Sequence, residues 1–116
     1  MLKGSHQQVA LEAAPLQQKL LLACTVLLMN ASGKSEVEEA LLRARHRAIC
    51  MTNMHSEDVP PLPVPDQNEA IARLCAARLL DAAPTAGTLR LTVQPDDVRA
   101  VIRSVPQLAH LFPQVQ

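Results

Sequence analysis

The sequence predicts one mainly α-helical domain that carries a small β-hairpin. Apolar residues recur at helical spacing in four stretches, near residues 15–30, 35–51, 66–78 and 95–105. Between residues 79 and 93 the apolar period changes to two on the far side of a Pro-to-Gly bend, which is typical of a hairpin. A chain of 116 residues is long enough for one domain with a modest core.

The helix before the hairpin begins with a capping-box pattern. Asp66 can cap the helix, and Glu69, three residues on, can reach back to the amide of the cap. The predicted buried stripe of this helix recurs at helical spacing and consists of Ile71, Leu74, Cys75 and Arg78. We therefore expect the helix to begin at Asp66 and to bury a narrow face.

The hairpin follows directly. Leu79 and Leu80 lead to a bend between Pro84 and Gly87. Beyond the bend, the apolar residues Leu89, Leu91 and Val93 alternate with Arg90 and Thr92. Such alternation predicts a half-buried strand that shows Arg90 to solvent.

Residues 15–30 predict a central helix. Its apolar positions cover most of the circumference, and Ser32 with Gly33 ends it. The continuous apolar run from Leu20 to Met29 is too short for a membrane span, which takes about 20 residues, so we expect no membrane partner.

A second capping box, Ser35 with Glu38, predicts the next helix, which extends to about Met51; a third strand near its start is the alternative for that segment. Its expected inner face consists of Val37, Leu41, Ala44 and Ala48. Acids precede basic residues along this helix, which suits the helix dipole. A phosphate-contacting patch that includes Arg43 and Arg47 is the functional alternative.

The remaining segments are shorter. Residues 1–6 resemble vector-derived sequence, so we place the domain at residues 7–105 and a tail at residues 106–116. The proline-rich segment 52–65 predicts an extended surface linker. Pro95 with Asp96 and Asp97 suits the start of a last amphipathic helix, and Leu108, Leu111 and Phe112 of the tail could fold back onto the core.

Composition restricts the function. Eleven basic and eleven acidic residues cancel, so no global field draws the chain to nucleic acid or to a membrane. Phe112 is the only aromatic residue, which argues against base stacking on single strands. Three cysteines sit in helical apolar patterns, which predicts reduced, buried thiols in an intracellular protein.

No enzymatic motif is convincing, and we expect no catalysis, metal, cofactor or small-molecule substrate. Gly33-Lys34-Ser35 matches the end of a phosphate-binding loop, but Leu28 stands where the earlier glycine is needed. The four histidines lie in unrelated elements with no metal-ligand spacing, namely His6, His46, His55 and His110. No Ser or Cys lies in a nucleophile motif.

Three helices followed by a hairpin form the winged-helix, or winged helix-turn-helix, arrangement, in which the third helix is the candidate recognition helix and the hairpin is the wing. The sequence also resembles a family. Four ordered segments carry the resemblance: residues 15–22 (PLQQKLLL), 48–51 (AICM), 78–80 (RLL) and 89–98 (LRLTVQPDDV). Over about residues 15–104 they are similar to the C-terminal winged-helix domain of the eukaryotic replication initiators, which are the large subunit of the origin recognition complex and its relative, the cell-division-cycle loading factor. Those proteins carry an upstream ATPase module that has no counterpart here, so the chain resembles an excised domain.

The resemblance implies a nuclear role in replication-origin licensing, in which the domain helps to hold DNA and contacts other initiator subunits or the replicative helicase. We expect weak, sequence-independent contact with double-stranded DNA. The candidate DNA contacts are Gln67, Asn68, Arg73, Arg90, Arg43 and Arg47. The outer face of the third helix is rich in alanine, however, and an ion pair of Arg73 with Glu69 is the structural alternative. A protein-docking module with little DNA affinity is therefore the competing function.

Overall fold

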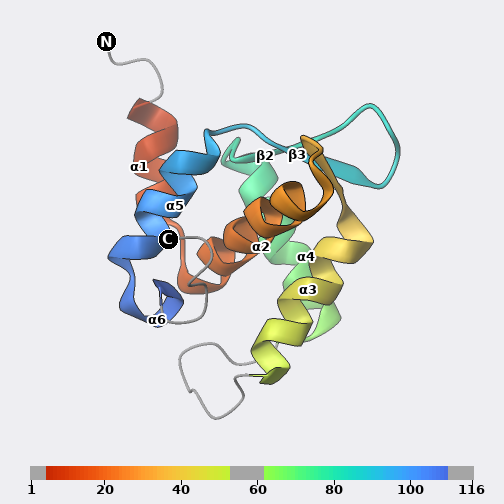
Figure 1. The fold of residues 1–116 in the computed structure, drawn as a ribbon, viewed down its shortest axis with the longest axis horizontal. Coiled ribbons are helices and arrows are strands. Elements are labelled where there is room, and N and C mark those ends of the chain that lie inside the picture. The colour runs from red at the N-terminus through yellow and green to blue at the C-terminus, as the bar shows by residue number, and fades with distance from the viewer. Residues whose placement is uncertain (1–4, 53–61, 110–116) are drawn as a thin grey trace.

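The computed structural model describes residues 5–52 and 62–109 and confirms a mainly helical chain with a small antiparallel sheet (Figure 1). The helices are α1 (Ser5–Ala13), α2 (Leu16–Ser32), α3 (Glu39–Thr52), α4 (Val64–Ala76), α5 (Pro95–Ser104) and α6 (Pro106–Ala109). The strands are β1 (Glu36–Glu38), β2 (Leu80–Ala82) and β3 (Thr88–Leu91).

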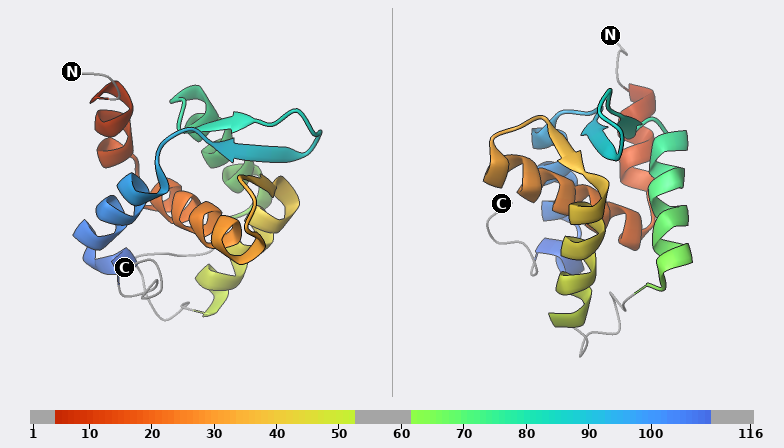
Figure 2. Two further views of the ribbon diagram at one scale, coloured as in Figure 1. Left: turned by 45° about the horizontal axis from the view of Figure 1, so that its top comes forward. Right: turned by 90° about the vertical axis from the view of Figure 1, so that its right-hand side faces the viewer.

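Helix α2 is the centre of the core, as its apolar circumference predicts. Every side chain from residue 20 to residue 27 is buried. The helix packs against α3 and α4 on one side and against α5 on the other, so that it crosses the middle of the molecule (Figures 1 and 2). It ends at Gly33, which has a φ of 72° and donates its amide to the carbonyl of Met29.

The sheet has the order β1-β3-β2, with both pairs antiparallel. Val37 of β1 pairs with Leu89 of β3, and Leu80 of β2 pairs with Leu91. These four side chains are buried, so one face of the sheet covers the helices. The bend between β2 and β3 uses Gly87 at a φ of 79°, where a side chain would be strained.

The strand alternative at the start of the second helix is confirmed, and the Ser35 capping box is wrong. Residues 36–38 form β1 because Val37 gains burial and strand pairing there, and α3 begins only at Glu39. The charge order along α3 changes accordingly. Glu39 is the acid of its first turn, and its last turn holds no basic residue.

The predicted inner face of the second helix is also wrong. Leu41, Ala44 and Ala48 are exposed, and Val37 belongs to the strand. The face that meets α2 consists of residues spaced four apart, which are Leu42, His46 and Cys50. A polar histidine at the middle of that stripe is the reason why the apolar pattern misled the prediction.

Helix α4 begins earlier than its sequence indicates. Pro63 is its N-cap residue and Pro65 lies in its first turn, so Asp66 is a first-turn residue that does not cap the helix. The proline-rich linker falls mostly in residues 53–61, outside the described residues. The buried face of α4 is Gln67, Ala70, Ile71 and Leu74, with Cys75 half-buried.

Arg78 does not belong to that buried stripe. It lies beyond the end of α4 with a φ of 63° and its side chain is exposed. The amide of Arg78 donates to the carbonyl of Cys75, and the amide of Leu79 donates to that of Leu74. This pair of bonds is a Schellman motif, in which an arginine occupies the left-handed position that glycine usually takes.

The two ends of the described chain close the core. Helix α1, which the sequence analysis did not predict, begins at Ser5, buries Leu11 and lies beside α5 (Figure 1). Helix α5 begins with Pro95, as predicted, and buries Val98, Val101 and Ile102. The tail folds back as far as α6, where Leu108 is fully buried; Leu111 and Phe112 lie outside the described residues.

Candidate functional site

Gln67 faces the core, contrary to its predicted place on the DNA-facing side of α4. Its side chain is 2% exposed. The Nε2 group donates to the main-chain carbonyl of Arg43 at 3.0 Å and to Nδ1 of His46 at 2.9 Å. Because both amide hydrogens are used inside the protein, Gln67 has none left for a base edge.

His46 is the centre of this polar network, which sequence reasoning missed. The ring is fully buried, and its Nε2 lies 2.8 Å from Oε1 of Gln17. Since the Gln67 Nε2 group can only donate, Nδ1 accepts, and Nε2 carries the hydrogen that it donates to Gln17. The network joins α2, α3 and α4. Burial of the ring, with a smaller effect from Arg47, lowers the pKa of His46 to about 4.

Asn68 and Arg73 do lie on the exposed side of α4. A guanidinium nitrogen of Arg73 is 3.6 Å from a carboxylate oxygen of Glu69, one turn earlier. The Arg73 side chain is 68% exposed, so water and salt screen this pair. The ion pair that the sequence analysis gave as the structural alternative is therefore present.

Arg90 lies on the outer face of the sheet among carboxylates. It is 3.6 Å from Asp81 of β2, and it is directly opposite Glu36 of β1 in the strand register. Glu38 has the same parity as Glu36 on β1 and thus shares this face. Asp81 and Glu36 thus flank Arg90 on the two neighbouring strands, and Glu38 lies on the same face, which weakens any attraction of this face to phosphate.

The two arginines of α3 differ. Arg43 forms an ion pair with Glu39 at 3.3 Å, and both side chains are partly covered. Arg47 is exposed, and within the described part of the chain no ion pair involves it. The six predicted contact residues thus come from α3, α4 and β3, and one of them is inside the core.

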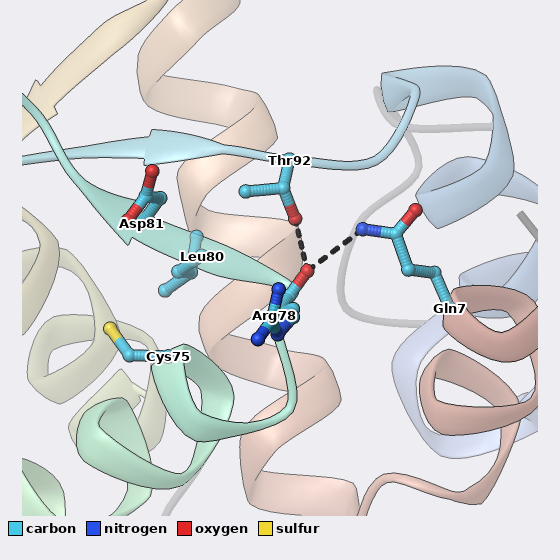
Figure 3. A pocket seen from close by; sticks show the side chains of 6 residues that line it. All are labelled: Gln7, Cys75, Arg78, Leu80, Asp81 and Thr92. Atoms are coloured by element: carbon cyan, nitrogen blue, oxygen red, sulfur yellow. Dashed lines mark hydrogen bonds between the residues drawn. The ribbon is translucent and has the colours of Figure 1, made fainter.

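A pocket of about 440 Å³ lies where α1, the end of α4 and the sheet meet. Figure 3 shows the side chains of Gln7 and Thr92 converging on the main-chain carbonyl of Arg78. Gln7 Nε2 donates to this carbonyl at 3.0 Å, and the Thr92 hydroxyl donates to it as well. These bonds hold α1 against the turn after α4, so the side chains of Gln7 and Thr92 have a structural role there.

A second hollow, of about 490 Å³, opens beside β1. Its apolar lining comes from the end of α2, the middle of β1 and the start of α3: Leu28, Val37 and Leu41. Its charged lining is Lys34, Glu36 and Glu38. We call this hollow the β1 groove.

The cysteines are unsuited to nucleophilic chemistry. Cys24 and Cys50 are buried and Cys75 is half-buried, and all three are free thiols. Burial raises the pKa of each thiol, and the neighbouring acids Glu39 and Asp81 raise that of Cys75 further.

Among the described residues, no cluster of three or more His, Cys, Asp or Glu side chains could hold a metal ion. Of the described helices, none by itself is long and apolar enough to cross a membrane. Helices α1 and α2 pass that length and composition test only as a pair bent by 116°.

Comparisons with known proteins leave the family open. No protein-family model matches the chain, and a search of curated proteins found no significant relative.

Proposed function

We propose that this chain is a winged-helix domain of a DNA replication initiator, that it works in origin licensing in the nucleus, and that it acts there mainly by docking protein partners. The order α2-β1-α3-α4-β2-β3, with three antiparallel strands, is compatible with a winged helix. The resemblance of residues 15–104 to the initiator domains supplies the biological setting. Because a fold does not fix a function, the docking role rests on the properties of the surface itself.

The observation that carries the docking role is the neutral surface of the candidate recognition helix and wing. Arg73 and Arg90 each lie 3.6 Å from a carboxylate, and Gln67 is buried. The bend between β2 and β3, residues 83–87, contains no basic residue. Affinity for DNA comes mostly from Lys and Arg that neutralise phosphates, and this surface offers few such groups.

Weak DNA contact is the second candidate function, and the exposure of Arg73 favours it. An exposed ion pair contributes little, about 0–1 kcal/mol, so a phosphate can compete with Glu69 for Arg73. The exposed Arg47 adds one further cation. Two or three such contacts give a dissociation constant on the order of 10⁻⁴ to 10⁻⁶ M at physiological salt, the range of non-specific complexes.

The test measures both partners with the same protein. Fluorescence anisotropy with two unrelated duplexes, over a range of salt concentrations, gives the DNA affinity. Biolayer interferometry with purified initiator subunits and the replicative helicase gives the docking affinity. We expect equal, weak binding of both duplexes and tighter binding of at least one protein.

A matched pair of variants locates the docking surface. Ala72→Glu places a charge on the exposed face of α4, and Ala100→Glu places one on exposed α5 as the control. We expect Ala72→Glu to weaken the protein complex roughly tenfold or more and Ala100→Glu to leave it unchanged, because desolvating an unpaired charge at an interface is costly. Tight binding to only one duplex, or no binding to any initiator protein, would overturn the proposal.

A further inference from the structure

Strand β1 is an edge of the sheet, with spare backbone hydrogen-bonding groups. Among residues 5–52 and 62–109 the sheet order is β1-β3-β2, so β1 pairs with a strand on one side only. The amide of Glu39 donates to the carbonyl of Gly87, and Val37, two residues earlier, has the same orientation toward β3. The alternation of an antiparallel ladder then directs the amide and carbonyl groups of Glu36 and the amide of Glu38 away from β3. The carbonyl of Glu38, the residue before α3, instead accepts the first hydrogen bond of that helix. Such an edge is a template for another strand.

The β1 groove lies next to this edge. It offers Leu28, Val37 and Leu41 as an apolar lining, and Leu41 is 52% exposed although it is a large apolar side chain. The described residues therefore leave about half of the Leu41 side chain in water. An apolar side chain of a bound segment would remove that surface from water.

The charge beside the groove selects the partner. Glu36 and Glu38 contribute two carboxylates, and Lys34 is the only basic residue among the lining residues. The lining therefore carries a net negative charge, which disfavours DNA at this edge. A second copy of the chain that paired β1 with β1 would bring the same glutamates together, which is also unfavourable. A basic segment fits both the charge and the open edge.

We propose that the β1 edge and the β1 groove bind an extended segment of a partner protein in which apolar and basic residues alternate. The segment pairs with β1 as an added strand, its apolar side chains lie in the groove against Leu41, and its Lys or Arg side chains face Glu36 and Glu38. Alternate side chains of a strand point to opposite faces, so one segment can satisfy both requirements. This inference deepens the docking role and rests on it, because it names the chemistry of one docked partner.

The test uses a probe peptide in place of the partner. A capped heptapeptide of alternating Lys and Val is titrated into the ¹⁵N-labelled chain, and amide shifts are followed by NMR. One matched peptide carries Glu in place of Lys, and another carries N-methyl groups on the backbone amides that would pair with β1. We expect saturable shifts at Glu36, Glu38 and Leu41 with the Lys peptide and none with the other two.

Variants of the chain separate charge from shape. Glu38→Lys should weaken binding of the Lys peptide at least tenfold, and Leu41→Ser should weaken it severalfold. Glu12→Lys, on the exposed side of α1, is the control and should change nothing. Both test positions are exposed, and spectral dispersion reports whether each variant is folded.

Two outcomes would overturn the inference. One is the absence of shifts at β1 when the wild-type chain is folded. The other is equal binding of the Lys and N-methylated peptides, which would mean ionic adsorption without strand pairing. In either case, binding of purified initiator subunits that responds to Ala72→Glu would leave the proposed function standing, so the two failures are distinguishable.

Discussion

His46 should make the stability of this domain depend on pH, whereas a histidine with the same pKa in the folded and unfolded states would contribute no such dependence. The folded protein lowers the pKa of His46 from 6.5 to about 4, chiefly because the ring is buried. The unfolded chain therefore binds more protons than the folded one between these two pH values. Stability from this group is fully present above about pH 6.5 and is lost as the pH falls toward 4.

The size of the effect follows from the same shift. Lowering the pKa from 6.5 to about 4 corresponds to about 3 kcal/mol of unfolding free energy. The hydrogen bonds give the physical reason. A protonated ring would present an N–H at Nδ1 to the Nε2 group of Gln67, which is itself a donor. Turning the Gln67 amide over would break its bond to the carbonyl of Arg43.

Two measurements check this prediction. NMR of the imidazole nitrogens should show His46 neutral, with the hydrogen on Nε2, down to about pH 5. Urea unfolding followed by circular dichroism should show a loss of stability between pH 6.5 and pH 4 that is smaller in His46→Leu by about 3 kcal/mol. The reasoning is refuted if His46 titrates near its ordinary pKa, or if the two proteins lose stability in parallel.

Three further predictions follow from other sites. Arg78→Gly should stabilise the fold by about 0.5–1 kcal/mol in urea unfolding, because relief of the left-handed backbone strain outweighs the conformational entropy that glycine loses on folding. Arg78→Ala, which keeps the strain, is the control, and a less stable glycine variant would contradict the prediction. Alkylation of the folded chain, followed by mass spectrometry, should label half-buried Cys75 slowly and should label Cys24 and Cys50 only after unfolding. Labelling of Cys24 or Cys50 before Cys75 would contradict this prediction. Asp81→Asn removes the ion-pair partner of Arg90 while Glu36 and Glu38 stay on the same face, so duplex binding should tighten and its log–log salt slope should steepen by up to about 0.9. An unchanged slope would show that Arg90 does not contact phosphate.

The parts of the fold that sequence predicted well are those in which the apolar pattern is continuous. Helix α2 has an almost uninterrupted aliphatic run, and strand β3 alternates strictly, so packing and pattern agree. Pro95 likewise indicated the start of α5 correctly. These elements are local, and their burial could be deduced without knowing their neighbours.

The misplaced elements depend on contacts that are distant in sequence. Residues 36–38 look like the first turn of a helix, but they pair with β3, about 50 residues later. Gln67 looks like a surface residue until His46 and the Arg43 carbonyl give it partners. The one available signal was the spacing of Leu42, His46 and Cys50, four residues apart, which would have placed a histidine on the buried face of α3.

The candidate DNA contacts were predicted from residue type, and the structure changes their meaning through their neighbours. Arg73 was on the predicted face, and its partner Glu69 was also anticipated. The carboxylates around Arg90 were not, because Asp81 and Glu36 reach it only through strand pairing. Charge on a sheet depends on the register, which the sequence alone left undetermined.

We propose that the exposed surface of α4 and of the hairpin formed by β2 and β3 docks proteins and contacts DNA only weakly. The most direct test of this claim is the ratio of two dissociation constants for the intact chain, measured in one buffer at physiological salt, for a generic duplex and for the purified initiator proteins. We predict that at least one initiator protein binds roughly tenfold or more tightly than the duplex. Duplex binding that equals or exceeds binding of every initiator protein would contradict the claim.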